Sequence, residues 1–316
     1  MRKHVLESIL VAGVSLAVPA HPAPAEPAPP QAGKSPVQVF ILAGQSNMEG
    51  QGIVAGEKPG TLETLLKDPA TAPRFKHLAD ASGKWVVRDD VWIWYLGRTG
   101  GLTTGYSPKG NAIGPELQFG HIVGDAIPNQ VLLIKTAWGG KSLAKDFRPP
   151  SAGGEVGPFY TQMLGHVKEV LGGLKTLFPA YDGKGYEIAG FGWHQGWNDR
   201  VNQAFCDEYE KNLACLVRDL RKDLGVPKLP FVVAETGMTG PEEKHPRALS
   251  LMKAQAAVAE YPEFKGNVAF VGTRDFWRPK EASPSGQGYH WNNNAETYFL
   301  IGDGIGKAML GLLGKK

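Results

Sequence analysis

Five short apolar runs, separated by helical patterns, restrict the fold of this 316-residue chain more than any other feature. Each run is rich in Val, Ile or Phe and lacks strict alternation, which is typical of strands covered on both faces. Strands of this kind form parallel sheets between layers of helices. The predicted strands span residues 37–43, 131–136, 186–191, 230–234 and 267–271.

Helical patterns follow or separate these strands at the spacing of right-handed βαβ units. They predict an α/β fold, a three-layer α/β/α sandwich around a parallel sheet of about five strands. Residues 53–113 interrupt the alternation, and we interpret them as a long insertion that places a small hairpin over the sheet edge. The predicted helices span residues 115–127, 160–177, 203–224, 247–261 and 294–313.

The first residues have the pattern of an export signal. Arg2 and Lys3 precede a ten-residue apolar run, which is too short to span a bilayer, and small residues follow it. We therefore predict a signal peptide at 1–25, a Pro/Ala-rich disordered leader at 26–35 and one folded domain at 36–316. The mature protein is expected to be secreted or periplasmic, without stable membrane insertion after signal removal.

Charge and cysteine content exclude several other classes. The formal net charge of +3 does not favour nucleic acid as a partner. Cys206 and Cys215 fall nine residues apart in one predicted helix, so about 13 Å separates them and no disulfide is expected. The eight His residues lack metal-ligand spacing, and we predict neither a metal nor another cofactor.

Reactive side chains follow four of the predicted strands, at the sheet edge where ligands bind in such folds. Ser46 lies in the turn GQSNMEG after the first strand, where N–H groups at a helix start can stabilise an oxyanion. WGGKS follows the second strand, and the glycines allow close approach of a backbone N–H. GWHQGWND offers a side-chain amide, and His290 in YHWN is the best-placed general base for a serine.

Together these motifs resemble the sialate O-acetylesterase-like branch of the SGNH hydrolases, close to carbohydrate esterase family 6. The resemblance covers residues 36–314 and implies a flavodoxin-like sandwich and a metal-free carboxylic ester hydrolase. It further implies that Ser46 is the nucleophile and that His290 is the base. The oxyanion hole would combine the Ser46 N–H with Gly139 or Gly140 and with the Gln195 amide.

One position departs from the family pattern. The family commonly has Asp three residues before the His, and this chain has Gln287. A glutamine can fix the tautomer of the imidazole but cannot offset the charge of the imidazolium. Either a Ser–His dyad operates, or another carboxylate orients the base. The candidates by position are Asp275, Glu281, Asp199 and Glu296.

The predicted function is removal of O-acetyl groups from a carbohydrate, either a xylan-type polysaccharide or sialic acid. The alternative, motivated by Gln287, is a non-catalytic secreted carbohydrate-binding protein on the same scaffold. An esterase or lipase for non-carbohydrate esters ranks lower, because the loops lack long apolar runs. Trp92 and Trp94 are interpreted as packing residues. The predicted substrate contacts are Gln45, Asn47, Trp138, His194, Trp197 and Trp291.

Overall fold

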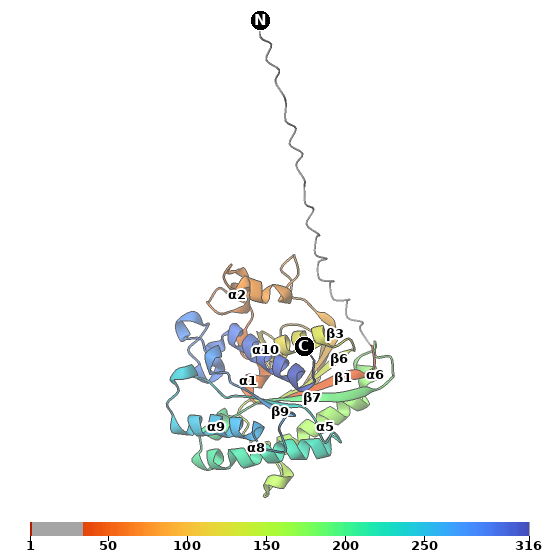
Figure 1. Ribbon diagram of the computed structural model, residues 1–316, viewed down its shortest axis with the longest axis vertical. Coiled ribbons are helices and arrows are strands. Elements are labelled where there is room, and N and C mark those ends of the chain that lie inside the picture. Colours follow the sequence, from red (N-terminus) through yellow and green to blue (C-terminus); the bar gives the residue numbers. More distant parts are fainter. Residues whose placement is uncertain (2–33, 316) are drawn as a thin grey trace.

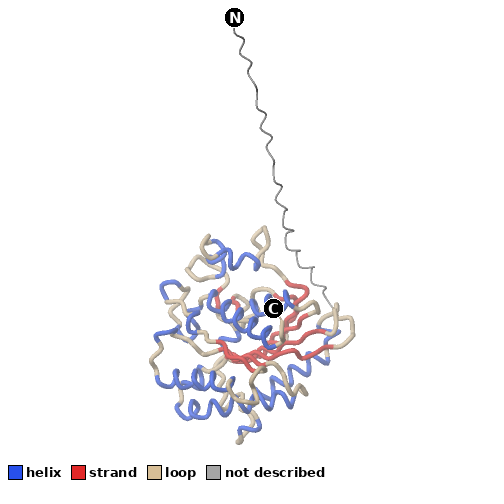
Figure 2. The backbone as a smooth tube through the Cα atoms, in the orientation of Figure 1, coloured by secondary structure: helices blue, strands red, loops and turns tan. Residues whose placement is uncertain are grey.

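The computed structural model describes Met1 and residues 34–315, so the predicted signal peptide and most of the predicted leader lie outside the described residues. The described chain is built on one seven-stranded sheet, with helices on both faces (Figures 1 and 2). The strand order is β4-β3-β6-β1-β7-β8-β9. The strands are β1 (Val37–Gly44), β3 (Arg88–Tyr95), β4 (Arg98–Leu102), β6 (Val131–Ala137), β7 (Tyr186–His194), β8 (Phe231–Ala234) and β9 (Val268–Val271).

The α/β sandwich is confirmed, and the five predicted strands are β1, β6, β7, β8 and β9. The expected count of about five was too low, because the inserted region adds β3 and β4 to the same sheet. β3 pairs with β6 in parallel, and β4 is the one strand of this sheet, among the described residues, that pairs antiparallel. A further short pair, β2 (Gly52–Ile53) and β5 (Ala112–Ile113), lies outside it.

Burial on both faces explains why β3 joins the sheet instead of covering its edge. Val91 and Ile93 face one hydrophobic core, and Trp92 and Trp94 face the other. Trp92 stacks on Phe178 with ring centroids 4.9 Å apart, as expected for a packing residue. The alternation of aromatic and aliphatic side chains is therefore that of an inner strand with two buried faces.

Helices divide between the two faces of the sheet. In Figure 1, α10 (Ala295–Leu312) lies on one face, and α5 (Pro158–Gly172), α8 (Gln203–Asp223) and α9 (Pro246–Ala259) lie on the other. α4 (Glu116–Ala126) packs beside α10. The shorter helices are α1 (Ser46–Glu49), α2 (Leu62–Lys67), α3 (Ala72–Phe75), α6 (Leu174–Leu177) and α7 (Trp197–Arg200).

Successive residues of β1 supply both cores. Phe40 and Leu42 pack in the core that α4 and α10 cover, and Val39 and Ile41 pack in the core that α5, α8 and α9 cover. All four side chains are fully buried, and each such burial stabilises the fold by about 1.5–3 kcal/mol. The central strand is thus fixed from both sides, together with the turn that follows it.

The predictions for the two cysteines and for the helix at 160–177 have different outcomes. Cys206 and Cys215 on α8 are both buried and unbridged, as expected. The single helix predicted at 160–177 is instead two helices, α5 and α6, which meet at Gly172 and Gly173 because glycine weakens a helix interior. None of the helices among the described residues is both long enough and apolar enough to cross a membrane.

The connections from β1 define where a ligand can enter. β1 pairs with β6 on one side and with β7 on the other. α4 precedes β6 on one face of the sheet, and α5 follows β6 on the opposite face. The chain therefore changes face beside the carboxyl end of β1, which is the position where open α/β sheets bind their ligands.

Candidate active site

Ser46 is the first residue of α1, directly beyond the carboxyl end of β1. Gly44 makes this sharp turn possible, because its φ is +154° and an added Cβ would lie 2.1 Å from the His194 carbonyl oxygen. The Ser46 residue is 9% exposed, and its N–H has no acceptor within the described residues. A serine with a free main-chain N–H therefore stands where β6, β1 and β7 end.

His290 lies in the irregular segment Gly288–Asn293, between β9 and α10, which we call the base segment. Burial lowers the pKa of its imidazole, so the neutral form able to accept a proton is favoured near neutral pH. Among the described residues, neither the Ser46 hydroxyl nor the His290 imidazole forms a hydrogen bond, with each other or with another group. Such bonds often tighten only when substrate binds.

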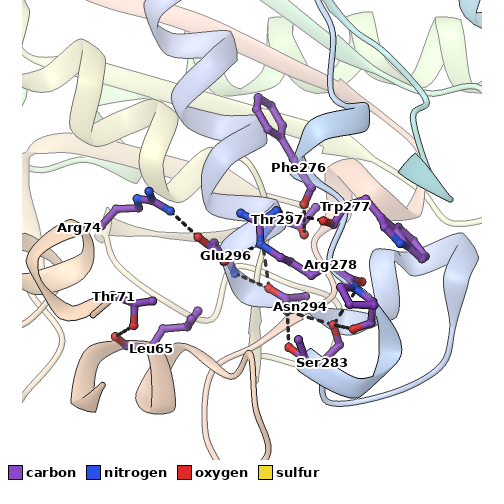
Figure 3. Close-up of polar contacts among 12 residues, drawn as sticks. Leu65, Thr71, Arg74, Phe276, Trp277, Arg278, Ser283, Asn294, Glu296 and Thr297 are labelled. Carbon is purple, nitrogen blue, oxygen red and sulfur yellow. Dashed lines mark hydrogen bonds and ion pairs between the residues drawn. The ribbon is translucent and has the colours of Figure 1, made fainter. Parts of the chain in front are cut away.

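The predicted orienting residues lie elsewhere. The Gln287 side chain is exposed, and only its main-chain oxygen meets the base segment, accepting the His290 N–H at 2.8 Å. Asp275 and Glu281 are exposed as well. Glu296 is held between Arg74 and Arg278, with 2.7 Å to the Arg278 Nε (Figure 3). None of these four groups forms a hydrogen bond or an ion pair with the His290 imidazole, and burial alone accounts for the shift of its pKa.

Asp199 is fully buried and binds groups of the neighbouring loops. Its carboxylate accepts the main-chain N–H groups of Leu143 and Ala144, each at 2.8 Å, and the Gln195 amide at 2.6 Å. Burial raises the pKa of Asp199 to about 6, although these donors oppose the rise. The carboxylate therefore ties the loop after β6 to the loop after β7 and does not orient the base.

Gln195 was expected to donate to the oxyanion, and the observed geometry does not fit that role. Its Nε2 donates to Asp199 and to the Lys141 carbonyl at 2.9 Å, and its Oε1 accepts the Tyr209 hydroxyl at 3.0 Å. Both amide hydrogens are thus directed into the protein. The buried Asp199 requires donors, and the adjacent amide supplies one of them.

The two glycines after β6 differ in what their N–H groups face. The Gly139 N–H faces the carboxylate of Glu49, whose pKa is raised by burial and lowered in part by this contact. The Gly140 N–H has no acceptor among the described residues, and the Gly140 carbonyl accepts the Asn198 amide at 2.6 Å. Gly140 therefore leaves a main-chain donor free, and Gly139 has a partner.

A charged cluster that was not among the predicted site residues lies next to the nucleophile turn, residues 44–50. Lys135 is fully buried in β6 and donates to Glu116 at 2.7 Å, to the Glu49 carbonyl at 2.7 Å and to the Tyr106 carbonyl at 2.6 Å. The signal was present, because a lysine inside the apolar run VLLIKT needs buried partners. Through the bond to the Glu49 carbonyl, Lys135 holds the last residue of α1 against β6.

The predicted substrate contacts separate into two groups. Trp138 and Trp197 keep part of their surface exposed, and the Trp197 ring lies 5.7 Å from that of Tyr289. Tyr289 is 43% exposed and lies beside His290, so an aromatic surface adjoins the base. The other predicted contacts are at most 2% exposed and leave no surface for a substrate: Gln45, Asn47, His194 and Trp291.

Two of these buried residues have evident structural reasons. Gln45 accepts the main-chain N–H groups of Gly196 and Asn198 and so joins the nucleophile turn to the loop after β7. Burial lowers the pKa of His194 to about 4, so it is a neutral core residue near pH 7. Within the described part of the chain, no group of three or more His, Cys, Asp or Glu could hold a metal ion.

Comparisons with known proteins bear on the family and the fold. The family described as carbohydrate esterase, sialic acid-specific acetylesterase matches residues 36–299. A protein from Arabidopsis thaliana of known structure is 19% identical, with a TM-score of 0.58 over 87% of this chain and 98% of that one. A carbohydrate acetylesterase from Xanthomonas citri is 15% identical, with a TM-score of 0.54 over 86% of this chain and 55% of that one. A search of curated proteins gave no sequence match.

Proposed function

Because this chain belongs to the family of sialic acid-specific acetylesterases, which are carbohydrate esterases, we propose that it works as a serine esterase with Ser46 as nucleophile and His290 as base. The chain is a carboxylic ester hydrolase that acts on O-acetylated carbohydrate. The observation that carries the assignment of the nucleophile is the position of Ser46, in a glycine-bounded turn at the carboxyl end of the central strand.

The proposed reaction has two half-reactions. His290 takes the proton from the Ser46 hydroxyl as the oxygen attacks the acetyl carbonyl, and the sugar alcohol leaves with that proton. Water then attacks the acetyl-serine, with His290 again accepting and returning a proton, and acetate is released. The lowered pKa of His290 supports the base role, because the imidazole stays neutral, and so able to accept a proton, at lower pH than an ordinary histidine.

Main-chain donors are the best candidates for stabilising the tetrahedral oxyanion. The free N–H groups of Ser46 and Gly140 support this assignment, and the partners of Gly139 and Gln195 argue against them as donors. Removing one oxyanion donor typically costs about 10²–10³ in rate. We therefore assign the hole to Ser46 and Gly140, in place of the wider set that the sequence suggested.

The acetylated substrate is proposed to be a xylan-type polysaccharide or sialic acid, with the sugar stacked on the aromatic surface of Trp197 and Tyr289. The first test measures acetate release from acetylated xylan, acetylated sialic acid and 4-nitrophenyl acetate. Ser46→Ala should lose on the order of 10⁴-fold or more in kcat. Turnover by the Ser46→Ala variant at the wild-type rate would rule out this mechanism.

Export is a separate proposal that rests on the N-terminal sequence alone. A basic start and a ten-residue apolar run support removal of about 25 residues and a secreted or periplasmic mature protein. The mass of the protein recovered from the extracellular or periplasmic fraction tests it. Full-length protein that remains in the cytoplasm would contradict it.

A further inference from the structure

The base segment and the nucleophile turn are joined by one buried side chain, that of Asn47. It follows Ser46 directly and is 2% exposed. Its Nδ2 donates to the main-chain oxygen of Tyr289 at 3.0 Å, and its Oδ1 accepts the Tyr298 hydroxyl at 2.6 Å. The residue next to the nucleophile therefore holds the carbonyl group next to the base.

Tyr298 completes the connection from α10. Its hydroxyl lies 2.6 Å from the Asn47 Oδ1 and 3.2 Å from the main-chain oxygen of His290. The tyrosine is fully buried, and burial raises its pKa well above the ordinary value, so the hydroxyl remains a donor. Asn47 thus contacts the main-chain carbonyl of Tyr289, and Tyr298 contacts that of His290.

The backbone after His290 needs such restraint. Trp291, Asn292 and Asn293 have φ values of +51°, +54° and +58°, three consecutive residues in the left-handed region. Asparagine tolerates this conformation, but a bulky tryptophan there is strained. Strained backbone persists only where the surroundings determine it. A second link, from Asn293 Nδ2 to the Gln51 carbonyl at 3.1 Å, ties the same segment to the residues after α1.

No carboxylate among the described residues orients the His290 imidazole, yet its main chain is fixed relative to Ser46. We propose that Asn47 and Tyr298 are positioning residues that place the base through its own backbone, so that catalysis runs on a Ser–His dyad. This inference rests on the proposed function. The acid of a triad both orients the imidazole and stabilises the positive charge of the imidazolium. Asn47 and Tyr298 position the base but offer no negative charge.

The test compares Tyr298→Phe with Tyr160→Phe. Tyr160 is also buried, and its hydroxyl donates to Asp223 at 2.6 Å on the far side of the sheet from α10, so its loss controls for a missing buried hydrogen bond. Turnover of 4-nitrophenyl acetate and the rate of Ser46 labelling by a fluorophosphonate are measured per folded molecule. Asn47→Ala serves as a second variant.

We expect Tyr298→Phe to lose about 10²-fold in kcat and in labelling rate, with KM unchanged, since a misplacement of about 1 Å can cost that much. The pH at which activity falls on the acid side should not move, because no charge is removed. Tyr160→Phe should keep the wild-type kcat. Wild-type kcat in both Tyr298→Phe and Asn47→Ala, or a loss confined to KM, would overturn the inference. A wild-type protein that neither turns over nor labels would instead refute the proposed function, and the inference with it.

Discussion

The nucleophile turn and the base segment are held in place by different kinds of structure. Ser46 follows the central strand of a sheet whose neighbours pair with it on both sides, and Lys135 supports the end of its short helix. His290 lies in an irregular segment between an edge strand and the last helix, with a left-handed backbone directly after it. Regular hydrogen bonding fixes the first, and individual side-chain amides fix the second.

This difference indicates where each half of the site is vulnerable. The loops beside Ser46 share one buried carboxylate, Asp199, so damage there should affect folding. The segment around His290 is held by separate bonds, such as Asn292 Nδ2 to the Arg278 carbonyl at 3.0 Å and Asn294 Nδ2 to the Ala282 carbonyl at 2.9 Å. Damage there should affect catalysis before it affects stability.

The largest expected effect is that of Asp199→Ala on stability. Two main-chain N–H groups and the Gln195 amide would lose their buried acceptor, and the free energy of unfolding should fall by about 3 kcal/mol. Asp219→Ala, which removes the acceptor of the Ser151 N–H alone, should cost less. Denaturant unfolding measures both. An Asp199→Ala variant as stable as wild type would show that the nucleophile side does not depend on this carboxylate.

The pH dependence of stability sharpens the same point. The pKa of Asp199 is about 6 in the folded protein and lies above its ordinary value of 3.8, because burial disfavours the charge. The folded state therefore holds its proton longer than the unfolded state, and this contribution to stability is lost as pH rises from about 4 to 6. Asp199→Asn should lack this decline when unfolding is measured across that range.

An intermediate effect is expected on the base side when an acid is introduced. Gln287→Asp places a carboxylate three residues before the base. If it reaches the imidazole, it should raise the His290 pKa, move the acid limb of kcat/KM to higher pH and raise kcat up to about tenfold. Gln287→Asn is the uncharged control. An unchanged pH profile would mean that this position cannot reach the base.

The smallest expected effect concerns the contact between the two regions. Trp197 comes from the loop after β7, and its ring lies against Tyr289 of the base segment. Trp197→Ala should raise KM for acetylated oligosaccharides about fivefold, in line with the loss of about 1 kcal/mol of stacking, and leave KM for 4-nitrophenyl acetate unchanged. Trp92→Phe, a core change, should alter neither KM. Equal KM changes for both substrates would argue against a sugar platform.

Sequence patterns predicted the strands well and the partners of polar side chains poorly. Apolar runs located β1, β6, β7, β8 and β9, because burial on both faces leaves a direct compositional trace. Gln195 was assigned to the oxyanion because nothing local shows that Asp199 takes its hydrogens. Trp291 was expected in the cleft, but its ring is fully buried, on a backbone of left-handed conformation. Such outcomes depend on side-chain orientation and burial in the folded protein, which the local sequence does not show.

The parallel pairing of β3 with β6 limits how this protein could be re-engineered or could diverge. Residues 88–95 belong to the sheet, so the inserted region cannot be exchanged as a cassette without exposing the edge of β6. The Tyr106 carbonyl in the same region also binds the buried Lys135. Variation in length is therefore compatible with the fold only away from these anchors. Loop transplantation between relatives should therefore preserve residues 88–102 and Tyr106.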